Sequence, residues 1–111
     1  MLYGFSTGAL ARGDFASALR MLAPYDLKAV EISALRSTEL RSVVESLPTL
    51  PLRRFEHVTV HAPSKFDASE EEAIASAIAK VLPFVHGVIL HAEAFHDPRV
   101  WHPFGAKLLV E

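Results

Sequence analysis

Apolar and polar residues alternate in five short runs along the chain, with the two-residue period of a β-strand. The predicted strands are Leu2–Ser6, Lys28–Ser33, His57–His61, Gly87–His91 and Lys107–Glu111. Consecutive runs begin 20 to 30 residues apart, which is the spacing of repeated units of one strand and one helix. The pattern therefore predicts an α/β fold built from βα units.

Helical periodicity fills the intervals between these runs, and residues that favour helix starts precede it. Asp14 and Ser37 are predicted to cap the first two helices. Ser69 and Glu72 form a capping-box pattern that predicts the start of the third helix. Asp97-Pro98 predicts a fourth helix with a first-turn proline, which a proline at 103 and a glycine at 105 keep short.

Strands that alternate with helices predict right-handed crossovers and a parallel sheet. Two architectures fit: part of a (β/α)₈ barrel, or a five-stranded doubly wound sheet. We favour the barrel, because a doubly wound domain would usually have a helix after its fifth strand, whereas this sequence stops on the strand. Since a barrel typically needs about 250 residues, residues 1–111 would form one partial domain, with four βα units and a fifth strand. This first half of a TIM barrel should self-associate or require a C-terminal half.

Composition narrows the classes of function. Half of the 111 residues are apolar, enough for the core of one domain. The net charge of −2 provides no positive field, which disfavours nucleic acid and acidic membrane surfaces as partners. The absence of cysteine excludes disulfides and thiolate metal sites and is compatible with a reducing compartment. Without a signal sequence or an apolar run of about 18 residues, we expect a cytoplasmic protein with no membrane segment.

Three of the predicted strands end on polar residues that share the inner face of the presumed barrel. These residues are His61, His91 and Glu111. Parallel strands bring equivalent ends together, and imidazole with carboxylate suits a divalent ion such as Zn²⁺, Mn²⁺ or Mg²⁺. The alternative for each histidine is a partly solvated, hydrogen-bonded side chain at a strand end.

Four further residues are candidates for substrate binding: Ser6, Glu31, Ser64 and His96. Glu31 could equally be a strand-end carboxylate capped by the next loop. Loop polarity alone could explain Ser64, and packing at a helix start could explain His96. The remaining histidines are expected to be structural or surface residues: His57, His86 and His102.

Five segments carry a resemblance to a known family: GFSTGAL, AVEISAL, VTVHAPS, VILHAEAFHDP and KLLVE. Together they resemble the xylose-isomerase-like TIM barrel superfamily, which includes sugar-phosphate isomerases and epimerases and the endonuclease IV type of nuclease. The resemblance covers nearly all of the chain but only the first half of such a barrel. It implies a divalent-metal centre whose ligands match His61, His91 and Glu111, with further ligands from strands six to eight.

Three functions remain open, of which the resemblance suggests the first two. The first is a metal-dependent sugar or sugar-phosphate isomerase or epimerase, in which Glu111 would be both a metal ligand and the catalytic residue that moves a proton between carbons. The second is an endonuclease IV-like phosphodiester hydrolase. The third is a non-catalytic half-barrel fragment, which the missing strands favour for this chain alone.

Overall fold

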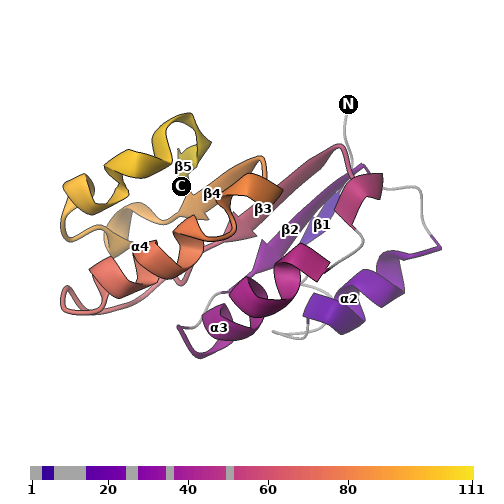
Figure 1. Cartoon of the computed structure of the whole chain (residues 1–111), viewed down its shortest axis with the longest axis horizontal. Helices are drawn as coiled ribbons and strands as arrows, with labels where there is room; N and C mark the ends of the chain where they lie inside the picture. Colours follow the sequence, from indigo (N-terminus) through magenta and orange to yellow (C-terminus); the bar gives the residue numbers. More distant parts are fainter. Residues whose placement is uncertain (1–3, 7–14, 25–27, 35–36, 50–51) are drawn as a thin grey trace.

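The described structure is built on a parallel five-stranded sheet, with the α-helices along one side of it (Figure 1). The structure is a computed structural model that describes residues 4–6, 15–24, 28–34, 37–49 and 52–111. The strands are β1 (Gly4–Ser6), β2 (Ala29–Ser33), β3 (His57–His61), β4 (Gly87–Leu90) and β5 (Leu108–Val110). Each lies within its predicted range, so the predicted α/β class with a parallel sheet is confirmed.

Helices follow the strands as the sequence pattern predicts. The α-helices are α2 (Phe15–Leu22), α3 (Ser37–Ser46) and α4 (Glu71–Ala79). The 3₁₀ helices are η1 (Leu47–Thr49), η2 (Leu52–Arg54), η3 (Leu82–Phe84), η4 (Ala92–Ala94) and η5 (Pro98–Lys107). None of the helices in the described part of the chain is both long and apolar enough to cross a membrane.

The two faces of the sheet have different chemistry. Alternate residues of the central strands are buried against α2, α3 and α4, which lie along one side of the sheet (Figure 1). These strand residues are Val30, Ile32, Val58, Val60, Val88 and Leu90. The residues between them are mostly polar and include Glu31, Thr59 and His61. Because side chains alternate along a strand, the apolar core holds the sheet to its helices and leaves the polar side chains on the opposite face.

The strands follow one another in the sheet in sequence order, from β1 to β5. This order suits consecutive units of a barrel and also one wing of a doubly wound sheet. The strand β5 forms one edge, where Leu109 is 42% exposed and Val110 is 59% exposed. The apolar edge expected from the sequence is therefore present in the described sheet.

The capping box predicted for α4 is wrong. The helix begins at Glu71, its N-cap residue is Glu70, and no side chain caps it. Residues 67–70 form a turn closed by the bond from the Glu70 N–H to the Asp67 carbonyl (2.9 Å). This turn delays the start of the helix, so Ser69 lies before the cap position.

The cap predicted at Asp97 is confirmed. Its carboxylate accepts a hydrogen bond from the Arg99 N–H, and Pro98 lies in the first turn. The helix that follows is the 3₁₀ helix η5, interrupted at Gly105, whose φ of 55° favours glycine. Asp14 and the side chain of Ser37, the two other predicted caps, lie outside the described part of the structure.

The core makes a direct prediction about stability. Ile32→Ala should lower the free energy of unfolding by about 2–5 kcal/mol, because it leaves a cavity between the sheet and its helices. Met21→Ala, at a site that is 51% exposed, should change it by less than about 0.5 kcal/mol. Urea denaturation followed by circular dichroism measures both values. Equal effects of the two substitutions would contradict the assigned core.

Candidate metal centre

Three side chains meet at the carboxyl ends of β3, β4 and β5. His61, His91 and Glu111 each offer one ligand atom, and these atoms lie within 4.8 Å of one another. The parallel register pairs His61 with Ile89 and Leu90 with Val110, which brings the residues at the strand ends to the same edge of the sheet. The three predicted ligands therefore come together and could hold a metal ion.

Backbone hydrogen bonds continue past the ends of the strands and fix this group. The Glu111 N–H donates to the Leu90 carbonyl (2.9 Å), and the Ala92 N–H donates to the Glu111 carbonyl (2.9 Å). Between β3 and β4, the Ala62 N–H donates to the Ile89 carbonyl (2.9 Å). The ligand-bearing residues therefore belong to a hydrogen-bonded ladder rather than to free loops.

The hydrogen bonding of the His61 ring leaves one of its nitrogens free to meet a cation. Its Nδ1 lies 2.8 Å from the Ala62 carbonyl oxygen, which can only accept, so Nδ1 carries the hydrogen. In the neutral ring the lone pair is then on Nε2, and this atom lies 3.6 Å from Glu111 Oε2. In metal sites, the ring nitrogen that does not bind the ion commonly donates a hydrogen bond of this kind, which orients the histidine.

The donor set fits a transition metal ion. The His61 side chain is 7% exposed and that of Glu111 is 63% exposed, so the group is closed on one side and accessible on the other. The rings of His61 and His91 are tilted by 48° with centroids 4.8 Å apart. Two imidazole nitrogens and one carboxylate oxygen suit Zn²⁺ or Mn²⁺ better than Mg²⁺, which prefers oxygen ligands.

A pocket of about 400 Å³ lies beside His91. Its other lining residues include Ser64, Lys65, Phe66, Glu93 and His96. Two of the predicted substrate-binding residues, Ser64 and His96, therefore share a cavity with a predicted ligand. The His96 Nε2 also donates to the Phe66 carbonyl (2.8 Å), so part of its role is to hold the loop.

The other two predicted substrate-binding residues lie deeper on the sheet. Glu31 is half-buried and pairs with Ser6 and Thr59, whereas Ser33, two residues later, pairs with His61. Glu31 does not belong to the metal-ligating group found among the described residues. The side chain of Ser6 lies outside the described part of the structure. Substrate binding by both residues stays a prediction.

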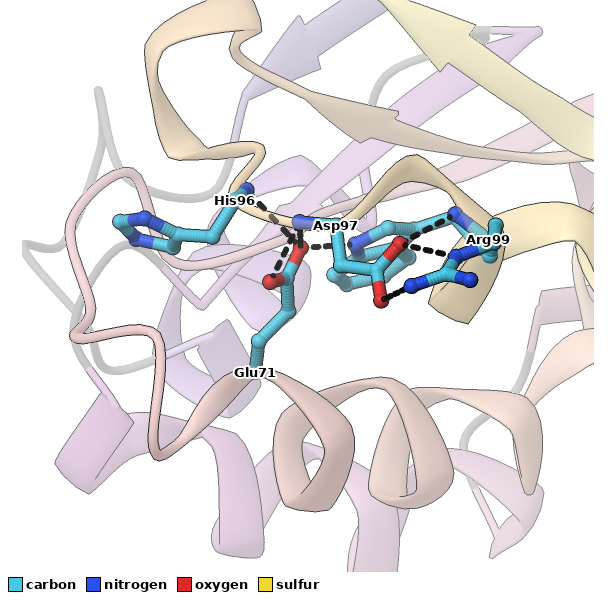
Figure 2. A network of polar contacts seen from close by, with 5 residues as sticks. Glu71, His96, Asp97 and Arg99 are labelled. Carbon is cyan, nitrogen blue, oxygen red and sulfur yellow. Dashed lines mark hydrogen bonds and ion pairs between the residues drawn. The ribbon is translucent and has the colours of Figure 1, made fainter.

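Among the described residues, the buried carboxylate of Glu71 was missed by the sequence analysis. Glu71 is 2% exposed and accepts hydrogen bonds from the loop after β4 and from η5 (Figure 2). In the sequence it stands between Glu70 and Glu72, and nothing distinguishes it from these neighbours. Beside it, bonding from Arg99 holds the pKa of Asp97 below its usual value.

The remaining histidines have no metal-ligating partners within the described structure. His57 and His86 stack at the opposite end of the sheet, with ring centroids 5.3 Å apart. His86 is exposed, and its Nδ1 accepts a hydrogen bond from the Val58 N–H (2.9 Å). Its role is therefore structural. His102 is exposed on η5.

The chain matches no family model, and no curated protein or solved structure matches it. Its class therefore rests on fold and site alone: an α/β protein whose parallel sheet carries a group that could hold a metal ion. The resemblance to xylose-isomerase-like barrels stays a prediction.

The metal centre predicts a selective effect of histidine substitutions. His61→Ala and His91→Ala should each weaken Zn²⁺ binding by about 100-fold or more, since even residues that only orient a ligand commonly contribute 10- to 100-fold. His102→Ala should leave the affinity unchanged. Isothermal titration calorimetry of the metal-free proteins measures the three values. Equal affinity in all three variants would show that the site is misassigned.

Proposed function

We propose that this chain carries the metal site of a metal-dependent isomerase or epimerase that acts on a sugar or sugar phosphate. The observation that supports the proposal is the meeting of His61, His91 and Glu111 beside a pocket, at the carboxyl ends of parallel strands. Active sites of (β/α)₈ enzymes lie at this end of the sheet. A half-barrel with four βα units and a fifth strand fits the observed strand order.

The reaction requires the removal of a proton from a carbon next to a carbonyl and its return to another position. A bound divalent ion would supply positive charge that polarises the carbonyl and lowers the cost of the enediolate. Glu111 would exchange the proton, and the large exposure of its side chain at the site supports this role. Ser64 and His96 would contact hydroxyl or phosphate oxygens from the wall of the pocket.

The donor set favours Zn²⁺ or Mn²⁺ as the ion, with Mg²⁺ as the weaker choice. A nuclease activity of the endonuclease IV type is disfavoured by the net charge of −2. A cytoplasmic location is part of the proposal, since the chain contains no cysteine.

The proposed chemistry predicts metal-dependent proton exchange. In D₂O, the Mn²⁺- or Zn²⁺-loaded protein should exchange the α-proton of its sugar substrate, and Glu111→Gln should slow the exchange by about 100-fold or more. Glu45→Gln, on an exposed face of α3, is the matched control and should have no effect. Proton NMR of a panel of aldoses, ketoses and their phosphates measures the exchange. Exchange that persists in EDTA or in Glu111→Gln would contradict the proposal, and cleavage of abasic DNA would favour the nuclease.

The exposed edge of the sheet favours a second candidate, a half-barrel that is non-catalytic alone and acts by association. Leu109 and Val110 are apolar and exposed on β5, which pairs only with β4 among the described strands, and an edge strand of this kind is prone to pair with another chain. The partner would be a second copy or a complementary C-terminal half.

Association predicts a particle larger than the 12.2 kDa monomer in sedimentation velocity. Val110→Lys should shift the protein to the monomer, because a lysine on an edge strand opposes pairing. Met21→Lys adds the same charge at an exposed helical site and should not change the sedimentation coefficient. A wild-type protein that sediments as a monomer across the micromolar range would contradict association between copies.

A further inference from the structure

Glu71 is a buried carboxylate whose hydrogen bonds all come from another part of the chain. Its Oε1 accepts from the N–H groups of His96 (3.1 Å) and Asp97 (3.2 Å) and from Trp101 Nε1 (2.8 Å). Its Oε2 accepts from the Asp97 N–H (2.9 Å). Figure 2 shows the side chain rising from the first turn of α4 toward the backbone at His96 and Asp97.

The segment that Glu71 holds begins at a predicted metal ligand. His91 directly follows β4, and the 3₁₀ helix η4 leads from it to Phe95. The Ala92 N–H bonds the Glu111 carbonyl at the start of this loop, and Glu71 fixes its far end at His96 and Asp97. The loop from His91 to Asp97 is therefore fastened at both ends.

A separate contact of His96 joins this loop to the loop that follows His61, the other predicted histidine ligand. His96 Nε2 donates to the Phe66 carbonyl (2.8 Å), and Phe66 lies in the loop between β3 and α4. The rings of Phe66 and His96 also meet edge to face, with centroids 5.8 Å apart. Glu71 and His96 thus connect the loops that leave His61 and His91.

We propose that Glu71 is a positioning residue of the metal centre: its carboxylate fixes the loop after β4 so that His91, and the pocket wall at His96, keep the geometry that binds the ion. The inference rests on the proposed metal site. A buried carboxyl group whose two oxygens accept from the loop and from η5, rather than from the N–H groups of its own helix, is placed to fix the loop rather than to cap α4. Groups that hydrogen-bond directly to a metal ligand commonly contribute 10- to 100-fold to affinity, and we expect Glu71, which acts through the loop, to contribute about 10-fold.

The test compares two substitutions that remove different bonds of the same carboxylate. Glu71→Gln keeps the size of the side chain and one acceptor oxygen, but it places an NH₂ group opposite the Asp97 N–H. It therefore replaces the shorter bond to the loop (2.9 Å) with a repulsive contact between two donors. Trp101 is 1% exposed. Trp101→Phe removes the hydrogen bond from its indole N–H to Glu71 and leaves the bonds that Glu71 accepts from His96 and Asp97. Binding of Co²⁺ to the 111-residue chain, measured by calorimetry and by its visible absorption spectrum, reports both affinity and ligand geometry.

Glu71→Gln should weaken Co²⁺ binding by about 10-fold or more and change the visible spectrum. Trp101→Phe should lower the melting temperature but bind Co²⁺ within about 2-fold of the wild type, with the same spectrum. If Glu71→Gln matches the wild type in both readouts, or if Trp101→Phe weakens binding equally, the positioning role is overturned. If Glu71→Gln does not fold, His96→Ala, which cuts the exposed bond to Phe66, should weaken binding several-fold, and an unchanged affinity overturns the inference.

These outcomes are separable from a failure of the metal site itself. If the wild type does not bind Co²⁺ or Zn²⁺, the proposed function fails together with this inference. If the wild type binds and the Glu71 and His96 variants bind equally well, only the positioning role fails.

Discussion

The parallel register of the sheet is the constraint on which the candidate site depends. Every neighbouring pair of strands among the five runs in the same direction, so all the carboxyl ends lie on one edge of the sheet. His61, His91 and Glu111, which are far apart along the chain, therefore lie close together because of the strand register and not because a long loop folds over the sheet. The separation of 3.6 Å between His61 Nε2 and Glu111 Oε2 follows from this register and from the ladder bonds that extend it past β4 and β5.

The two faces of the sheet separate stability from chemistry. Ile32 and Val60 are fully buried against the helices, and this face supplies the apolar burial that folds the chain. The opposite face can then hold polar groups, and the cost of burying them must be offset by hydrogen bonds. The buried ring of His61 keeps a hydrogen bond from Nδ1 to the Ala62 carbonyl, so its burial leaves only Nε2 available, on the side where the other ligands lie.

The features that depend on local periodicity, namely the strands and the face on which each residue lies, were predictable from the sequence. Alternation placed β3 at His57–His61, as the structure has it, and its parity put His61, His91 and Glu111 on one face. The start of α4 was predicted wrongly, because a turn at residues 67–70 competes with the capping pattern at Ser69. The role of Glu71 could not be predicted, since its donors at His96, Asp97 and Trp101 are neighbours only in the folded chain. A run of three glutamates gives no sign of which one is buried.

The backbone at the three ligands of the candidate centre is constrained to different degrees. This difference connects the site to β5, the edge strand of the sheet. His61 lies on β3, which is paired on both sides. Glu111 follows β5, which is paired only with β4 among the described strands, and its side chain is the most exposed of the three. A strand that paired with the free edge of β5 would restrict Glu111 before an ion arrives and so reduce the entropy lost on binding. Because such coupling is reciprocal, an ion held by Glu111 would in turn order β5 and favour its pairing. Metal binding and association at this edge are therefore expected to strengthen one another in the half-barrel that we propose.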